Sequence, residues 1–122
     1  MVADQVGAPT STELLADVTV KLLEAMSAAA DNDARWGVYH VAAACEVSWH
    51  GYAQHVIGTA KRMRPELAWQ VTEVAPVATS AFPTPAARPL NSRLCTNKLQ
   101  QVFGLVLPPW QQGVDRMLAE IL

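Results

Sequence analysis

The sequence predicts an α/β fold that is rich in helices and has a few short strands, in a single domain over residues 1–122. Apolar residues recur at spacings of three and four in several stretches, as they do along the buried face of a helix. Two short runs rich in β-branched and aromatic residues have the length of buried strands. A chain of 122 residues suits one domain and is too short for two. Together these observations favour an α/β domain in which helices dominate.

The first helix is predicted from about Ser11 to Ala29. Thr10 and Glu13 stand three residues apart, in the pattern of a capping box at a helix start. Apolar side chains then follow at four-residue spacing, at Leu14, Val18, Leu22 and Met26. The polar stretch at residues 31–33 predicts the loop that ends this helix.

The middle of the chain predicts a strand, a helix and a second strand. Residues 37–43, Gly-Val-Tyr-His-Val-Ala-Ala, read as a buried strand because the run is short, β-branched and aromatic. Ser48 is a typical N-cap for the helix that follows, and Pro65 ends that helix. Its apolar stripe comprises Trp49, Tyr52, Ala53, Val56, Ile57, Ala60 and Met63. Residues 69–74 alternate in polarity and predict the second strand.

The last third of the chain predicts a long loop and two helices. Four prolines between positions 76 and 89 favour an extended loop over residues 78–91, since proline removes a backbone donor. Thr96 can cap a short helix that Gly104 ends. Pro109 suits the first turn of a final helix with Trp110 on its apolar face.

Composition excludes several classes of protein. Hydrophobic residues make up 51% of the chain and charged residues 16%, which excludes a disordered tail. The same composition suggests apolar surface that belongs to a partner or to a missing part of the same fold. A net charge of −2 gives no basic footprint for nucleic acid. The chain has no 18-residue apolar run for a membrane span and no signal peptide at its start, so a cytoplasmic protein is expected. Cys45 and Cys95 are then expected to be buried thiols.

Searches for chemical motifs find no catalytic residues and no cofactor-binding residues. The six glycines never approach the glycine-rich turn that binds a dinucleotide, and neither tyrosine is followed four residues later by lysine. His50 and His55 are five apart, which places them on different faces of a helix, so both are expected at the helix surface. Trp49 and Trp110 each open an apolar helical stripe and are expected in the core.

The candidate site is the proline-rich loop, because long loops without secondary structure are often functional. Arg88 offers a planar fork of donors that suits a phosphate, and Asn91 and Ser92 add neutral donors. The alternative is structural: Arg88 pairs with a carboxylate, while Asn91 and Ser92 shape the next turn. Glu13 has two interpretations as well, as a helix-capping residue or as a metal or interface ligand.

Several segments resemble a known family in the correct order. These are Asp4-Gln-Val-Gly-Ala-Pro-Thr10 with Glu13-Leu-Leu-Ala-Asp17, then Gly37-Val-Tyr-His-Val-Ala42, then Ser48-Trp-His-x-Tyr-Ala53. Later segments are Pro83-Thr-Pro-Ala-Ala-Arg-Pro-Leu-Asn-Ser-Arg-Leu94, Thr96-x-Lys98-Leu99 and Phe103-Gly-Leu-Val-Leu-Pro108-x-Trp110. Together they resemble the C-terminal part of the dTDP-4-dehydrorhamnose reductases, which are extended short-chain dehydrogenase/reductases.

The resemblance implies the helix-rich, substrate-binding part of such a reductase, without the Rossmann core. The complete family enzymes use NADPH to reduce the 4-keto group of a dTDP-hexulose to dTDP-L-rhamnose, a precursor of cell-surface polysaccharide. Their cofactor turn and their Tyr-x-x-x-Lys pair belong to an N-terminal domain that would precede this chain. By itself the chain is therefore expected to bind no NADPH and to be inactive.

Two hypotheses follow for function. In the first, the chain is the nucleotide-sugar-binding portion of the reductase, with Arg88, Asn91 and Ser92 as the residues expected to contact a dTDP-sugar. In the second, it is a non-catalytic binding or regulatory module derived from the family. The implied partners are a Rossmann domain, another protein chain or a second copy. Some members of the family dimerise with Mg²⁺ at the interface, for which Glu13 is the candidate ligand.

Overall fold

The computed structural model describes all 122 residues, as four α-helices and one small antiparallel sheet. The helices are α1 (Thr12–Met26), α2 (Trp49–Met63), α3 (Asn97–Phe103) and α4 (Trp110–Ile121). The strands are β1 (Val6–Gly7) and β2 (Val47–Ser48), and a 3₁₀ turn spans Thr79–Ala81. No helix combines the length and the apolar character that crossing a membrane requires. The helix-rich α/β class is therefore confirmed.

Local capping signals set three of the eight helix ends, and the predicted cap of α3 by the Thr96 side chain is not formed. The hydroxyl of Ser48 accepts a hydrogen bond from the backbone N–H of Gly51 and begins α2 as predicted. Gly104 adopts left-handed angles, with φ 63°, and ends α3 as predicted. At α1 the predicted capping residue was wrong. Ser11 caps this helix through the N–H of Leu14, while the Thr10 hydroxyl accepts a hydrogen bond from the N–H of Ala43.

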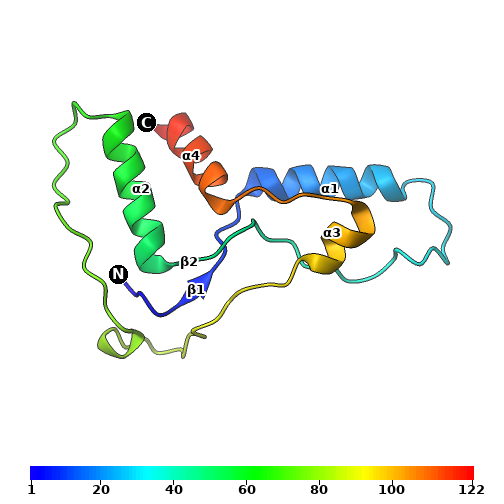
Figure 1. The fold of residues 1–122 in the computed structure, drawn as a ribbon, viewed down its shortest axis with the longest axis horizontal. Coiled ribbons are helices and arrows are strands. Elements are labelled where there is room, and N and C mark those ends of the chain that lie inside the picture. The colour runs from blue at the N-terminus through cyan, green and yellow to red at the C-terminus, as the bar shows by residue number, and fades with distance from the viewer.

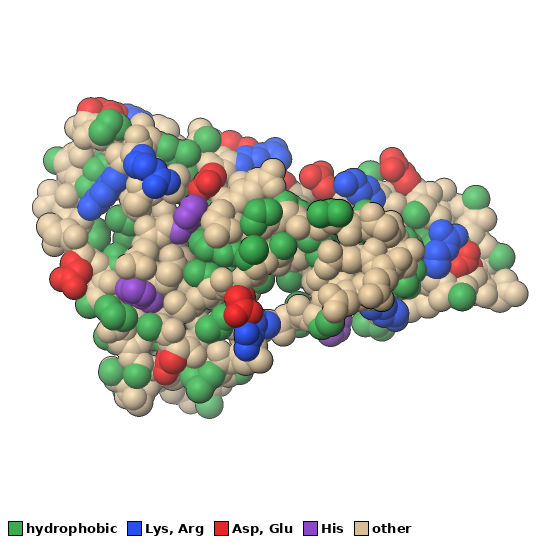
Figure 2. All heavy atoms as spheres, viewed as in Figure 1, with side chains coloured by type: hydrophobic (Ala, Val, Ile, Leu, Met, Phe, Trp, Pro, Cys, Tyr) green, Lys and Arg blue, Asp and Glu red, His purple; other side chains and the backbone are tan.

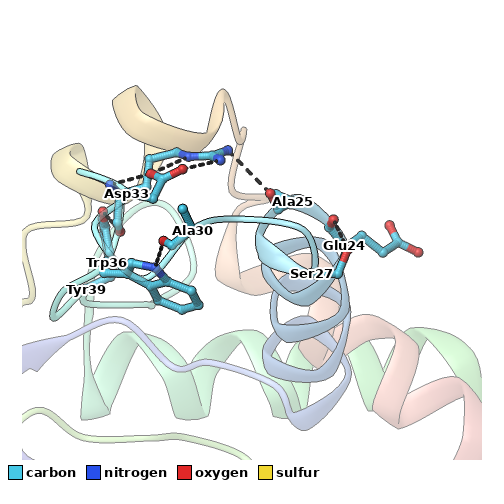
Figure 3. Close-up of polar contacts among 8 residues, drawn as sticks. Glu24, Ala25, Ser27, Ala30, Asp33, Trp36 and Tyr39 are labelled. Atoms are coloured by element: carbon cyan, nitrogen blue, oxygen red, sulfur yellow. Dashed lines mark hydrogen bonds and ion pairs between the residues drawn. The ribbon is translucent and has the colours of Figure 1, made fainter.

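The helix α1 also ends earlier than predicted, at Met26 in place of Ala29. The chain then turns through a loop that Asp33 and Arg35 hold together. The Asp33 carboxylate accepts hydrogen bonds from the backbone N–H and the guanidinium of Arg35, at 2.8–3.0 Å (Figure 3). The Trp36 indole N–H donates to the carbonyl of Ala30 in the same loop. This network redirects the chain after α1 without extending the helix.

Both strands predicted from sequence were wrong in secondary structure. Residues 37–43 and 69–74 are irregular, because neither segment lies beside another strand. A strand exists only where its backbone groups pair with those of a neighbour. The sheet that does form is too short to be predicted: Val6 pairs with Ser48 and Gly7 with Val47, in antiparallel register.

The N-terminal segment lies between α2 and the proline-rich loop. The N–H of Ala3 donates to the carbonyl of Val77, and the N–H of Val6 donates to that of Leu90. On its other side, the N–H of His50 donates to the carbonyl of Val2. As predicted, most of residues 78–91 form an irregular loop, and every residue from 80 to 95 is exposed. The loop is thus held at its two ends and open to solvent between them.

Two small apolar clusters form the core. The first lies where α2 packs on α4 and contains Ala43, Ala60, Trp110, Val114 and Leu118. The second contains Val18, Leu99 and Leu107, where α3 meets α1. Leu14 packs against both clusters and joins them. Trp110 is buried as predicted, whereas Trp49 was predicted for the core wrongly and is 48% exposed.

The molecule is elongated. In Figure 1, α2, α4 and the small sheet form one end, while α1 runs outward and α3 lies beside its far half. Figure 2 shows a broad body that narrows to an arm over α1 and α3. Only 12 of the 122 residues are buried, so the core is thin for the chain length. Cys45 and Cys95 are exposed, which corrects their prediction as buried thiols, since both lie in irregular segments outside the two clusters.

Candidate functional site

A cleft lies beside the small sheet. It has a volume of about 320 Å³, within the usual range for small-molecule sites. Its walls come from the segment around β1, from β2 with the start of α2, and from the end of the proline-rich loop. The lining residues are Gln5, Val6, Gly7, Ala8, Pro9, Val47, Ser48, Trp49, Tyr52, Arg88, Pro89 and Ser92. Three segments far apart in sequence thus meet at one cavity.

Backbone pairing places the proline-rich loop at the cleft. The carbonyl of Leu90 accepts from the N–H of Val6, and the N–H of Ser92 donates back to the carbonyl of Val6, both at 2.8 Å. Gly7 faces Ser92 closely: a Cβ at position 7 would lie 3.7 Å from the Cβ of Ser92. These contacts hold residues 88–92 against β1.

The start of the loop is fixed by a carboxylate. Asp4 accepts hydrogen bonds from the backbone N–H of Thr79 at 2.9 Å and from its hydroxyl at 2.6 Å. These donors, the hydroxyl above all, lower the pKa of the Asp4 carboxyl below its usual value. Gln5, which is buried, donates from its side-chain amide to the same Thr79 hydroxyl. Asp4 therefore stays ionised and keeps the loop attached to the N-terminal segment.

Arg88 lines the cleft and has no carboxylate partner. The five ion pairs of the protein all involve other residues. Its neighbour in the loop, Arg93, is by contrast fully engaged, with Glu46 at 2.8 Å and with the side chain of Asn91. The structure thus does not give Arg88 the carboxylate expected under the structural interpretation, and its fork of donors is free for an anion.

The other two candidate loop residues take different positions. Ser92 lines the cleft with Arg88. Asn91 is not among the lining residues, and its side-chain oxygen accepts from the backbone N–H and the Nε of Arg93, at 3.1 and 2.9 Å. Asn91 thus shapes the turn that follows the cleft, while Arg88 and Ser92 share it.

Two aromatic residues of α2 form a wall that the sequence reasoning missed. Trp49 and Tyr52 line the cleft, and their rings meet edge to face with centroids 6.1 Å apart. Tyr52 in turn contacts the buried Trp110 of α4, at 5.8 Å between ring centroids. The helical spacing correctly placed both side chains on one face of α2. Whether Trp49 is covered depends on which other segments pack over the start of α2, and the spacing of apolar residues does not give that information.

Glu13 lies away from this cleft, in a smaller pocket with Asp17 and Arg116. Hydrogen bonds from backbone and side-chain groups at the start of α1 lower the pKa of its carboxyl, its own backbone N–H most of all. No group of three or more potential metal ligands exists anywhere in the structure. Glu13 and Asp17 therefore bring two carboxylates to this pocket, beside the guanidinium of Arg116.

The residues of this chain do not fit a dinucleotide cofactor. Such a cofactor needs a strand that passes through a glycine-rich turn into a helix. The one strand that leads directly into a helix is β2, and it reaches α2 through Ser48 and Trp49, with no glycine between them. Gly104, the glycine with left-handed angles, follows a helix.

Comparison with known proteins identifies close relatives. A family model described as the RmlD substrate binding domain matches residues 1–122. A dTDP-4-dehydrorhamnose reductase of Shigella flexneri is 48% identical over 121 residues, which cover 99% of this chain and 39% of that protein. The chain thus spans well under half the length of this curated relative.

Solved structures agree. The dTDP-4-dehydrorhamnose reductase of Bacillus anthracis, in complex with NADP, superimposes with a TM-score of 0.77 at 30% identity, over 98% of this chain and 37% of that chain. A reductase of the same name from Clostridium acetobutylicum gives a TM-score of 0.78 at 25% identity, over 99% of this chain and 38% of that chain. The fold of these residues is therefore the fold of one part of those enzymes.

Proposed function

Because this chain belongs to the family of RmlD substrate binding domains, we propose that it is the nucleotide-sugar-binding part of a dTDP-4-dehydrorhamnose reductase. Its ligand is a dTDP-sugar, held in the cleft beside the small sheet. The observation that carries this proposal is the unpaired guanidinium of Arg88 in a cavity of about 320 Å³. A diphosphate is the part of such a ligand that a planar fork of donors suits.

Each predicted residue has a role in the proposal. Arg88 contacts the diphosphate, and the hydroxyl of Ser92 adds a hydrogen bond from the same wall. Asn91 acts as a positioning residue, because its side-chain oxygen accepts a hydrogen bond from the backbone N–H of Arg93 and so shapes the turn after the cleft.

The rest of the reductase supplies the chemistry. NADPH, when bound there, provides the hydride that reduces the 4-keto group of the sugar, and the residues described here bind and orient the substrate. The proposed partner of this chain is accordingly the cofactor-binding part of the reductase. Glu13 enters the proposal only if a second chain completes a metal site beside it.

Calorimetric titration of dTDP into the protein tests the proposal. We expect Arg88→Gln to weaken dTDP binding by about tenfold or more, because a hydrogen bond to a charged group contributes about 1.5–3 kcal/mol. Binding of thymidine, which has no phosphate, should be unchanged in the same variant.

Arg93→Gln is the matched control. It removes an arginine five positions away in the same loop, whose guanidinium is already held by Glu46 and Asn91. This variant should bind dTDP as the unaltered protein does. An absence of dTDP binding in the unaltered protein, or equal losses in both variants, would contradict the proposal.

A further inference from the structure

Trp49 is the exposed end of a row of aromatic side chains. The row begins in the core with Trp110, continues through Tyr52, and ends at Trp49 in the cleft, with centroid separations of 5.8 and 6.1 Å. Trp110 is 4% exposed, whereas Trp49 is 48% exposed. A large aromatic side chain that stays half exposed inside a cleft leaves part of its apolar ring uncovered. Uncovered apolar surface in a cleft is typical of ligand sites.

The Trp49 ring is held in place before any ligand arrives. Tyr52 contacts it edge to face, with an angle of 88° between the two ring planes. The backbone below it is fixed because Ser48 belongs to β2 and also caps α2. Tyr52 itself rests on the buried Trp110. A ring supported from the core loses little conformational freedom when a ligand stacks on it.

Arg88 lines the same cleft, and its guanidinium has no ion-pair partner. An aromatic face and a cation in one cavity match two parts of one molecule, a flat base and its phosphates. Stacking on an aromatic side chain accepts any base, because every base has a π-face. The cation supplies the preference for phosphate.

We propose that Trp49 is the platform on which the base of the bound nucleotide stacks, with the diphosphate on Arg88. This inference rests on the proposed function, since it assigns the base to one wall of the same cleft. It makes Trp49 a binding residue and Tyr52 the positioning residue behind it. The ligand class is a nucleoside diphosphate.

The test compares Trp49→Leu and Trp49→Phe with the unaltered protein, using dTDP, thymidine and inorganic pyrophosphate as ligands. Leucine keeps the position apolar and removes the π-face, while phenylalanine keeps a smaller face. We expect Trp49→Leu to weaken the binding of dTDP and of thymidine by about tenfold and to leave the binding of pyrophosphate unchanged. Trp49→Phe should stay within about threefold of the unaltered protein for all three ligands.

Fluorescence gives a second readout. The chain has four tryptophans, and we expect dTDP to quench a part of their emission that disappears in Trp49→Phe. Trp36→Leu is the matched control: Trp36 is similarly exposed, at 53%, but lies in the loop after α1. This variant should keep both the affinity and the quenching.

The outcomes separate the two proposals. If dTDP binds and depends on Arg88, but neither affinity nor quenching depends on Trp49, the stacking inference is wrong and the proposed function stands. If Trp49→Leu also weakens pyrophosphate, Trp49 acts by supporting the cleft, which overturns the inference. If dTDP does not bind at all, the proposed function fails and the inference fails with it.

Discussion

Asp33 shows how one side chain organises a turn. Its two oxygens accept three hydrogen bonds from Arg35, and the Nη1 of the same arginine donates to the carbonyl of Ala25 at the end of α1 (Figure 3). The Arg35 guanidinium, through its hydrogen bonds above all, lowers the pKa of the Asp33 carboxyl from 3.8 to about 2. The carboxylate is therefore bound better in the folded protein than in the unfolded chain.

This shift sets the direction of a pH effect. Because the pKa is lowered on folding, the contribution to stability is present above about pH 4 and is lost as the pH falls toward 2. We expect Asp33→Asn to lower the free energy of unfolding at pH 7 and to make little difference near pH 2. Urea unfolding at both pH values measures this.

Asp31→Asn is the control for this prediction. Asp31 is exposed, stands two residues earlier in the same loop and makes no hydrogen bond there. Its substitution should leave the stability unchanged at pH 7. A titration of the Asp33 carboxyl by ¹³C NMR that gives an ordinary pKa would show that the Arg35 contact is absent in solution.

At the scale of the elements, one glycine brings two helices together. Gly113 of α4 lies against Ser11, the residue that caps α1, and a Cβ at position 113 would be 2.8 Å from the Cβ of Ser11. Carbon atoms of residues that are not bonded to each other do not approach so closely, so the two segments would have to move apart. The start of α1 can thus lie close to α4 only because residue 113 has no side chain.

Gly113→Ala and Gly58→Ala form a matched pair. We expect Gly113→Ala to lower the free energy of unfolding by about 1–3 kcal/mol, the usual cost of overpacking. Gly58 lies inside α2 with nothing within 4 Å of its Cβ position, so Gly58→Ala should raise the stability by about 0.5–1 kcal/mol. Urea unfolding of both variants checks this, and a stabilised Gly113→Ala would refute the close contact.

The helices were predictable because their signals are local. Ser48 and Gly104 act on backbone groups within four residues, so their effect on the helix ends can be predicted from neighbouring positions in the sequence. The capping residue of α1 was misplaced by one, because Thr10, Ser11 and Thr12 all carry a suitable hydroxyl and the contact of Thr10 with Ala43 decides among them. Strands depend on distant partners, which explains the errors at residues 37–43 and 69–74.

The site was predictable only in part, for the same reason. Residue type pointed to Arg88 and Ser92, and the structure brings both to one cleft. Trp49 was assigned to the core because its spacing matches Tyr52 and Val56 on α2, which do pack against buried residues. Trp49 is the first residue of this stripe, and its burial depends on segments distant in sequence. Those segments, β1 and the loop at Arg88, border the cleft and leave Trp49 exposed.

At the scale of the molecule, backbone amides differ in how well they are protected from exchange with solvent. The packing of α2 on α4 encloses the larger of two small clusters, whereas residues 38–42 have five backbone N–H groups without an acceptor. We expect hydrogen exchange to be slowest in the middle of α2 and α4 and fast at residues 38–42. Mass spectrometry of exchanged peptides measures this pattern, and slow exchange at residues 38–42 would be inconsistent with the structure.

Residues 38–42 also leave four carbonyls without a hydrogen bond, at positions 39–42, and Ala42 is 5% exposed. Unpaired backbone groups of this kind can pair with the backbone of an extended peptide or of a second copy. We expect concentrated preparations of this protein to associate by strand addition at residues 38–42. We expect a short extended peptide that pairs with the backbone of residues 38–42 to reduce this association.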